Sequence, residues 1–255
     1  MSGFYVGVDG KARKIKGGYV GIDGVARKVK KGYIGDENGI ARLCYTELSF
    51  DPVFANNTWE DVIAACQNNA VPDTWSVGDQ MTMTIDGTEY AVDIIGKNHD
   101  DYSDGSGKAP LTFQLHDCYK VAYNMNNTSE NVGGWSTCKM KHTYLNDIFA
   151  LLQPSIMANI KEVTKTTNGF KSSDKLFLLS ETEVFGTSNY AAESVQYDFY
   201  KSNSAIKNAS SWLATWWLRT LDVSTLAQFC CVGKNGALSS DYSTANNYVS
   251  FAFCF

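Results

Sequence analysis

Residues 212–255 read WLATWWLRTLDVSTLAQFCCVGKNGALSSDYSTANNYVSFAFCF, and this stretch decides how the rest of the chain is interpreted. It begins with large apolar residues among apolar neighbours, which we expect to be core anchors. These residues are Trp212, Trp216, Trp217 and Leu218. It ends with alternating phenylalanines at positions 251, 253 and 255, a pattern typical of a terminal strand with one face packed inward.

The polar segments between these anchors, residues 222–228 and 239–248, have neither a helical nor a strand period. Their Ser, Thr, Asn and Asp content is ordinary for surface loops. The same composition with added Tyr suits a binding surface, because Tyr gives rigid contact area and Ser and Asn give adaptable hydrogen bonds. The candidate ligand-binding residues are Leu218, Thr220, Asp222, Ser224, Thr225, Leu226, Gln228, Lys234, Asn235, Ser239, Ser240, Asp241, Tyr242, Thr244, Asn246, Asn247 and Tyr248.

The N-terminal segment repeats every 14 residues. The copies read YVGVDGKARKIKGG at 5–18, YVGIDGVARKVKKG at 19–32 and YIGDENGIARLCY from Tyr33. Each copy places Asp-Gly or Asn-Gly between short β-branched runs, which is the strongest local signal for a β-hairpin. A unit this small needs stacking neighbours, the rest of the chain or other subunits. We therefore predict a hairpin repeat module for attachment or oligomerisation at 1–46, followed by a second domain at 47–255.

The second domain shows few strong helices and many loops, which predicts an α+β domain that carries its function on loops. Thr58 is expected to cap a helix, Asp86-Gly87 to turn a hairpin and Pro154 to interrupt a helical period. The expected elements are a helix over 59–66, a hairpin over 73–95, a helical segment over 142–163 and a buried strand over 175–180.

The net charge of −5 argues mildly against nucleic acid as a partner. Basic residues gather in the repeats, where their alternation with Val and Ile is expected to cover the solvent face of hairpins; a nucleic-acid arm is the alternative. They are Lys11, Arg13, Lys14, Lys16, Arg27, Lys28, Lys30, Lys31 and Arg42. No secretory signal and no apolar stretch of membrane-spanning length is recognised. The odd count of seven cysteines, without motif spacing, predicts reduced, buried thiols in a cytoplasmically folded protein.

Motifs for catalysis are missing. Gly105-Ser106-Gly107-Lys108 lacks the upstream Gly and the following Ser or Thr of a phosphate loop. The acidic loop Asp100–Asp104 departs from a calcium-binding pattern, so we expect a turn and leave calcium open. The three histidines lack ligand spacing and are expected in core or surface roles: His99, His116 and His142. Groups of a catalytic triad need only meet in space, so the sequence leaves catalysis unsupported.

Motifs across essentially the whole chain resemble those of a family of Firmicutes phage and prophage tail proteins, whose shared domain has no assigned function. They are Thr58-Trp59, Trp75-Ser76-Val77-Gly78-Asp79, Gly87-Thr88-Glu89-Tyr90, Ile94-Ile95-Gly96, His99-Asp100-Asp101, Asp104-Gly105-Ser106-Gly107-Lys108, Gly133-Gly134-Trp135, Asp174-Lys175-Leu176-Phe177-Leu178, Trp216-Trp217-x-Arg219 and Phe251-Ala252-Phe253-Cys254. The 14-residue repeats are also similar to repeats of these phage proteins.

The C-terminal half is similar to the variable proteins of diversity-generating retroelements. These have a C-type-lectin-like fold, related to that of formylglycine-generating enzymes, and place mutable residues on a surface near the C-terminus. Such retroelements mutate template adenines, so Asn codons become Ser, Asp, Tyr or Thr, the residue types that fill 239–247. This chain departs from its relatives at Thr220-Leu221, where they have Ser-Pro, and at Ala252, where they have Gly.

The resemblance implies an α+β, C-type-lectin-like domain after the hairpin repeats, in a phage tail receptor-binding or adhesion protein that is not an enzyme. Its expected location is the virion tail, after synthesis in the bacterial cytoplasm without a signal peptide. The implied partners are a host cell-surface protein or glycan and, through the repeats, other tail proteins. We expect a homo-oligomer, a trimer by analogy with tail fibres, with no cofactor, nucleic acid or membrane insertion.

Two alternatives stay open. One is an enzyme acting on a cell-wall glycan, which would place two carboxylates roughly 5–9.5 Å apart across a cleft. The other is a purely structural tail component whose C-terminal loops pack against another subunit.

Overall fold

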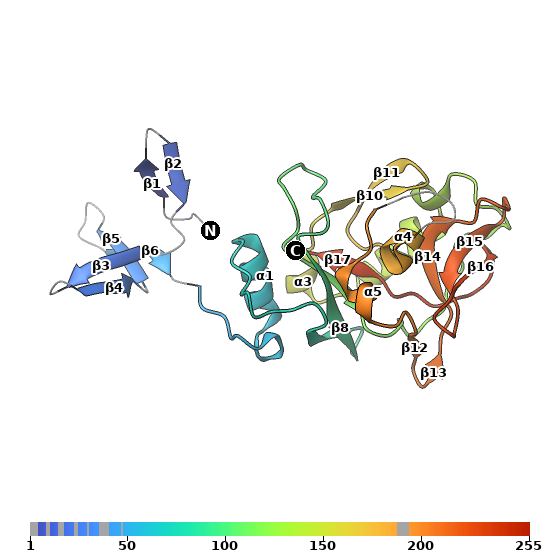
Figure 1. The fold of residues 1–255 in the computed structure, drawn as a ribbon, viewed down its shortest axis with the longest axis horizontal. Helices are drawn as coiled ribbons and strands as arrows, with labels where there is room; N and C mark the ends of the chain where they lie inside the picture. The colour runs from blue at the N-terminus through green and yellow to red at the C-terminus, as the bar shows by residue number, and fades with distance from the viewer. Residues whose placement is uncertain are drawn as a thin grey trace. The chain divides into compact units, whose positions relative to one another are not determined.

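The computed structural model describes residues 5–8, 11–14, 18–22, 25–29, 31–35, 41–46, 48–187 and 194–255. The chain divides into two compact units, Met1–Phe50 and Asp51–Phe255 (Figure 1).

The N-terminal unit contains three antiparallel hairpins, as the repeats predict. Their strands are β1 (Tyr5–Val8) with β2 (Lys11–Lys14), β3 (Gly18–Ile22) with β4 (Val25–Val29), and β5 (Lys31–Gly35) with β6 (Ala41–Thr46). The first two hairpins share one register, because Tyr5 pairs with Lys14 and Tyr19 with Lys28. The predicted turns, and the side chains of most basic residues of the repeats, lie outside the described residues.

The C-terminal unit is a mixed α+β structure with several small antiparallel sheets, which confirms the predicted class. Its four-stranded sheet has the order β17-β9-β8-β7. The strands are β7 (Gln80–Ile85), β8 (Thr88–Lys97), β9 (Leu111–Leu115) and β17 (Ala252–Cys254). Asp86 and Gly87 turn β7 into β8 as predicted, with φ angles of 48° and 70°. All five residues of β9 are buried, so this strand lies in the core.

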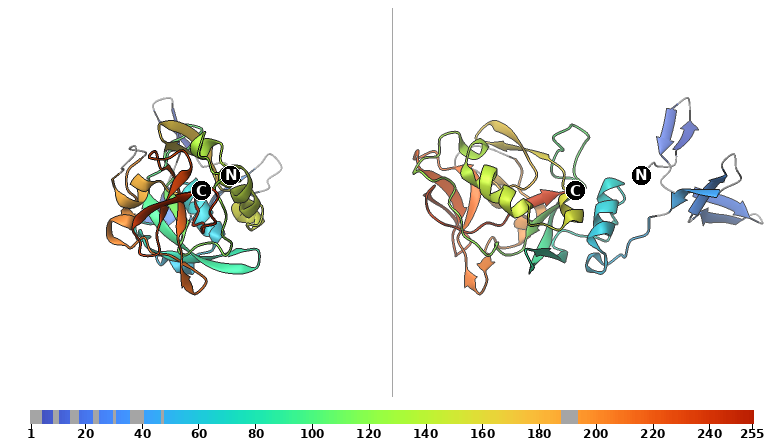
Figure 2. Two further views of the ribbon diagram at one scale, coloured as in Figure 1. Left: turned by 90° about the vertical axis from the view of Figure 1, so that its right-hand side faces the viewer. Right: turned by 180° about the vertical axis from the view of Figure 1, so that it is seen from behind.

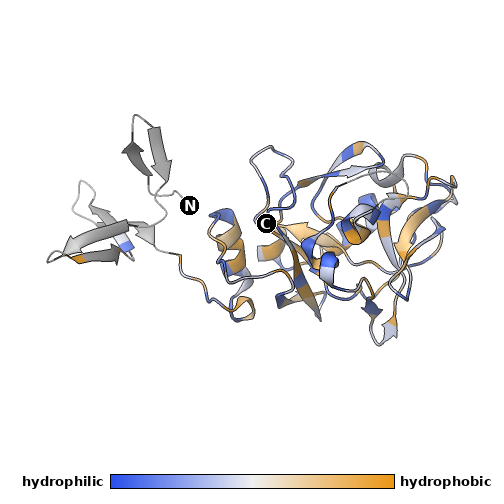
Figure 3. Ribbon diagram, in the orientation of Figure 1, coloured by the Kyte–Doolittle hydropathy of each residue, from blue (hydrophilic) through white to orange (hydrophobic). Residues whose placement is uncertain are grey.

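Helix α1 (Trp59–Gln67) packs on this core and starts where the sequence predicts. The Thr58 hydroxyl accepts a hydrogen bond from the Asp61 backbone N–H at 3.2 Å, and the Asp61 carboxylate accepts one from the Thr58 N–H at 3.0 Å. This reciprocal capping box satisfies backbone donors at the helix start. Trp59 then places its ring 5.6 Å from that of Phe113 on β9. Figure 3 shows apolar residues concentrated in α1 and in the interior strands.

The C-terminal segment is buried on both faces, so the expectation of one inward face is wrong. Strand β17 pairs with β9 on one side, where Phe253 lies opposite Phe113. On its other side the backbones of Ala252 and Phe177 exchange hydrogen bonds of 2.8 and 3.0 Å. Phe177 belongs to the predicted strand at 175–180, which is an extended, largely buried segment with this isolated bridge and not a regular strand.

A second antiparallel sheet, in the order β14-β15-β16, lies at the end of the unit opposite α1 (Figures 1 and 2). Its strands are β14 (Trp216–Leu221), β15 (Gln228–Val232) and β16 (Leu238–Tyr242). Trp216, Trp217 and Leu218 are buried as predicted. Trp212 is not a core anchor, because it is 80% exposed on β13. The small hairpin of β12 (Asn208–Ala209) and β13 (Trp212–Leu213) projects from the body of the unit (Figure 1).

The helical elements are short, and the predicted period over 142–163 gives only two brief helices and a π-helical turn. Pro154 begins a new helix, because proline fits the first helical position, where its missing N–H costs nothing. The elements are η1 (Phe54–Asn56), η2 (Gly134–Ser136), η3 (Met140–Tyr144), α2 (Leu145–Phe149), α3 (Pro154–Met157), α4 (Glu181–Phe185) and α5 (Asp198–Ser202). A hairpin of β10 (Val163–Thr167) and β11 (Phe170–Asp174) follows α3. Among the described helices, none has the length and apolar character to cross a membrane.

The six described cysteines are free and buried, as predicted. Burial raises the pKa of the Cys66, Cys118, Cys138 and Cys231 thiols to about 12. These side chains therefore behave as small apolar residues at neutral pH, because a thiol and not a thiolate is present.

Candidate functional site

Leu218 and Thr220 lie on β14, and the other candidate ligand-binding residues fall into two adjoining segments and one separate turn. Loop 222–228 joins β14 to β15, and it meets the segment after β16 where the Ser243 N–H donates to the Ala227 carbonyl at 2.8 Å. Gln228 and Tyr242 are paired at this end of the β15–β16 hairpin, whereas Val232 and Leu238 are paired at the other end. Lys234 and Asn235 occupy the turn beyond Val232 and so lie away from the other candidates.

Four of the candidate residues are buried: Leu218, Thr220, Asp222 and Asn247. The Thr220 hydroxyl accepts a hydrogen bond from the Glu181 N–H at 2.9 Å. The Asp222 carboxylate accepts from the Ser224 N–H at 2.9 Å, and the Asn247 amide donates to Asp241 at 3.0 Å. The sequence predicted that these four side chains would contact a ligand, but in the structure they are buried and contact the protein itself.

The remaining candidates in the adjoining segments form what we call the recognition surface. They are exposed or partly exposed: Ser224, Thr225, Leu226, Gln228, Ser239, Ser240, Asp241, Tyr242, Thr244, Asn246 and Tyr248. Leu226 is 78% exposed and Tyr242 is 55% exposed, which is unusual for large apolar and aromatic side chains and marks places where a partner gains most by covering them.

The backbone of loop 222–228, one part of the recognition surface, is held by Asn131, a residue that no sequence motif singled out. Its buried side-chain amide donates to the carbonyls of Asp222, Thr225 and Gln228 at 3.4, 3.0 and 2.8 Å. Its own N–H donates to the Leu226 carbonyl at 2.9 Å. One side chain about ninety residues upstream therefore holds the loop backbone, together with the buried Asp222 of the loop itself.

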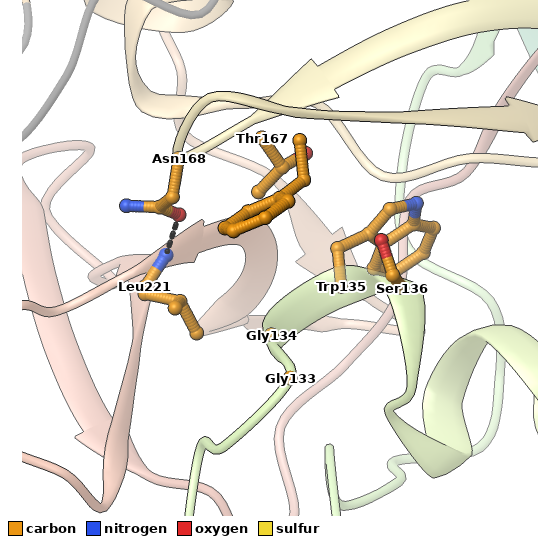
Figure 4. A pocket seen from close by; sticks show the side chains of 8 residues that line it. Gly133, Gly134, Trp135, Ser136, Thr167, Asn168 and Leu221 are labelled. Atoms are coloured by element: carbon orange, nitrogen blue, oxygen red, sulfur yellow. Dashed lines mark hydrogen bonds between the residues drawn. The ribbon is translucent and has the colours of Figure 1, made fainter.

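A cavity of about 360 Å³ opens beside this loop, at the end of β14 (Figure 4). Its lining residues are Gly133, Gly134, Trp135, Ser136, Thr167, Asn168, Phe170 and Leu221. The Asn168 side-chain oxygen accepts a hydrogen bond from the Leu221 N–H at 3.2 Å, which ties the β10–β11 turn to β14 (Figure 4). None of these eight residues was a candidate in the sequence, although Gly133-Gly134-Trp135 was part of the family resemblance.

The C-terminal unit also contains a buried ionic cluster, which includes Arg219 of the Trp216-Trp217-x-Arg219 motif. The Arg219 guanidinium donates hydrogen bonds to both Glu183 carboxylate oxygens, at 2.5 and 2.9 Å. The Lys165 ammonium contacts Glu183 Oε1 at 3.1 Å and also contacts Asp100. Tyr197 donates its hydroxyl to Asp100 at 2.8 Å. In this cluster two buried cations neutralise two buried carboxylates. Buried charges are tolerated when they are paired in this way.

Residues 112–254, more than half of the chain, match the family described as Domain of unknown function (DUF6273). The chain belongs to the DUF6273 family. The DUF6273 match runs from β9 to β17 and so includes the recognition surface, the cavity beside it, and three of the four charged residues of the cluster. No curated protein and no solved structure matches the chain significantly.

The cluster of this DUF6273 domain does not suit a metal ion, although His99, Asp100 and Glu183 bring ligand atoms within 4.8 Å of one another. The Lys165 ammonium already bridges the two carboxylates, so an ion would have to displace it or share the space with it. Like charges this close repel strongly in a buried site. The ammonium therefore takes the role that a bound cation would have.

The same two carboxylates are ion-paired, an arrangement that matches the acid and base of a glycan hydrolase poorly. They line a polar cavity of about 320 Å³. Burial alone would raise the pKa of both carboxyl groups. The positive charges of Arg219 and Lys165 outweigh burial at Glu183 and lower its pKa. The charge of Lys165 does the same at Asp100. A glycosidase needs one carboxyl protonated near neutral pH, and that needs a raised pKa.

The acidic loop makes a turn, with Gly105 at φ 74°. Its carboxylates face different partners, because Asp101 pairs with Lys108 at 3.1 Å while Asp104 accepts from the Ser106 N–H at 2.9 Å. Asp100 belongs to the ionic cluster. The three side chains thus have separate structural roles.

The ionic cluster predicts that the folded protein loses stability at acidic pH. Because the folded pKa values of Asp100 and Glu183 are lowered from 3.8 and 4.5, the unfolded chain takes up protons first. Their contribution to stability is complete above about pH 5 and is lost as the pH falls through the folded pKa values. We expect the melting temperature, followed by circular dichroism, to fall steeply below about pH 4.5. A flat melting temperature down to about pH 3 would contradict this account.

Proposed function

We propose that the protein is a phage tail receptor-binding or adhesion protein whose C-terminal unit has a C-type-lectin-like fold and binds its ligand without catalysing a reaction. The observation that supports the proposal is the recognition surface itself, where exposed side chains are carried by loop 222–228, which Asn131 holds, and by β16, which is paired with β15. A preorganised backbone lowers the entropy lost on binding, so affinity depends on the side chains displayed.

The arrangement also suits diversification. Thr244 and Asn246 are exposed, and other polar residues of the surface, such as Ser240, are partly exposed. Exchange of such side chains leaves the buried support Asn131 untouched. A surface of this kind fits the variable proteins of retroelements that the C-terminal half resembles, with a cell-surface protein or glycan as ligand.

The hairpin repeats fit a role in assembly. A two-stranded hairpin alone is marginally stable in water, so three of them in series gain from pairing with other chains. We propose contacts with other tail proteins and a homo-oligomer, with a trimer as the first candidate. Several copies on one virion tail would raise the avidity of each recognition surface.

Binding to bacterial envelopes tests the proposal. Alanine at Leu226, Tyr242, Thr244 and Asn246 is expected to weaken pull-down of envelopes from Firmicutes hosts at least about tenfold, because interface anchors each contribute more than about 1 kcal/mol. The melting temperature is expected to stay unchanged, since these side chains are exposed.

The matched control carries alanine at four exposed positions elsewhere: Ile206, Ser211, Trp212 and Leu213. It is expected to bind like the unaltered protein. Equal binding by both variants would show that the recognition surface does not bind the envelope. Failure of the unaltered protein to bind any envelope would favour the structural-component alternative.

A further inference from the structure

The cavity beside loop 222–228 has a floor of bare backbone. Gly133 and Gly134 have φ angles of +79° and +57°, a region that favours glycine. A Cβ on Gly133 would lie 2.1 Å from the Thr137 hydroxyl, and a Cβ on Gly134 would lie 3.2 Å from the Leu221 side chain. Glycine at position 134 therefore leaves the space beside Leu221 open, while glycine at position 133 avoids a collision with Thr137, which does not line the cavity.

The walls of the cavity are held in place before any ligand arrives. Trp135 is buried, and its indole N–H donates to Asp174 at 3.2 Å. Phe170 begins β11 directly after the Asn168-Gly169 turn and is 73% exposed. Because Asn168 is tied to the backbone of Leu221, the hairpin that carries Phe170 keeps its position against β14. The cavity is thus preformed, as ligand sites usually are.

The lining indicates an uncharged, largely apolar occupant. None of the eight lining residues carries a charge, in contrast to the polar cavity at the ionic cluster. Among the polar lining groups, the Thr167 hydroxyl accepts from Arg219 at 3.0 Å and the Asn168 oxygen accepts from Leu221. A volume of about 360 Å³ is at the small end for ligand sites, which suits one large side chain.

Exposed apolar residues join the cavity to the recognition surface. Val132 is 70% exposed just before Gly133, and Val223 is 57% exposed just after Asp222. Leu226 lies next to them, because its carbonyl accepts from the N–H of Asn131. Exposed apolar side chains gathered near one another favour protein–protein contact.

We infer that this cavity is the anchor pocket of the recognition surface and takes one aromatic or branched apolar side chain of a protein ligand. The inference rests on the proposed binding function and narrows its ligand from protein or glycan to protein. Phe170 and Leu221 would contact the inserted side chain, with the Gly133–Gly134 backbone below it. The exposed polar residues of the surface would then provide the rim.

Capped amino acids test the pocket on the full-length protein. The N-acetyl amides of Trp, Phe and Leu are titrated by saturation-transfer NMR, beside N-acetylalanine amide and N-acetylglucosamine. We expect saturable binding of the three large side chains and none of alanine or the sugar. Phe170→Ala is expected to weaken binding at least about tenfold, because it removes an aromatic wall. Trp212→Ala, which removes an equally exposed aromatic ring from another hairpin, is expected to leave it unchanged.

Absence of saturable binding by any of the large amides overturns the inference, as does equal binding by the Phe170→Ala and Trp212→Ala variants. Binding of N-acetylglucosamine in place of the amides would make the cavity a sugar site. These titrations need no bacterial receptor, so they separate the two proposals. Envelope binding without amide binding would keep the receptor-binding proposal and reject the anchor pocket. Amide binding without envelope binding would keep the pocket and reject the receptor.

Discussion

Glu183→Gln is expected to lower the free energy of unfolding by about 3–5 kcal/mol, because it removes a fully buried charge from a neutralised cluster. The glutamine has nearly the same shape but removes the carboxylate that pairs with both Arg219 and Lys165, while Asp100 still pairs with Lys165. Neither cation can move into water, since both are buried. Urea unfolding followed by circular dichroism measures the change.

The control is an ion pair of the same kind on the surface. Lys201 and Asp198 lie 2.6 Å apart, and their side chains are 58% and 59% exposed. Asp198→Asn is therefore expected to cost less than about 1 kcal/mol, because solvent screens the pair. If the two substitutions cost the same, the cluster is not the stabilising element described above.

Phe253→Ala is expected to cost about 3–5 kcal/mol, the usual loss when a buried aromatic side chain is truncated. Phe253 is fully buried in β17, and its ring lies 5.4 Å from that of Phe113 and 5.5 Å from that of Phe255. The surrounding strands are paired on both sides, so they cannot collapse into the space left behind. The midpoint of urea unfolding reports the loss.

Phe170→Ala is the matched control, because it makes the same substitution at a side chain that is 73% exposed. A change within about 0.5 kcal/mol is expected for it. The same measurement shows that the pocket variant is folded. A small cost for Phe253→Ala would mean that the four-stranded sheet is not the main core of the unit.

Features set within a few residues could be predicted from the sequence. Thr58 caps α1, Asp86-Gly87 turns β7 into β8, and the 14-residue repeat gives hairpins, because each signal is local backbone chemistry. Burial was harder, since it depends on distant partners. Trp212 resembles its neighbours Trp216 and Trp217 in sequence, yet it lies on a projecting hairpin.

The site was predicted in part for the same reason. The polar composition of 222–228 and 239–248 identified two segments that do meet, but not the side chains within them that are buried. Asn131, Phe170 and the Gly133–Gly134 floor come from other parts of the chain. Lys165 sits in the polar-looking run VTKTT, where nothing in the sequence distinguishes an inward lysine from a solvated one. Only tertiary contacts make that distinction.

The Asn131 side chain holds the backbone of the neighbouring loop and does not contact the side chains that the loop displays, among the hydrogen bonds described. Its amide holds carbonyl oxygens, which every amino acid has, so these contacts to residues 222–228 do not depend on the loop side chains. Within the loop only the buried Asp222 and the Thr225 hydroxyl add side-chain contacts to the backbone, among the hydrogen bonds described. A library that randomises the other outward positions and keeps Asn131, Asp222 and Thr225 would therefore vary chemistry on a constant frame. In engineering terms the domain is a display scaffold, and the part to conserve lies outside the part to be varied.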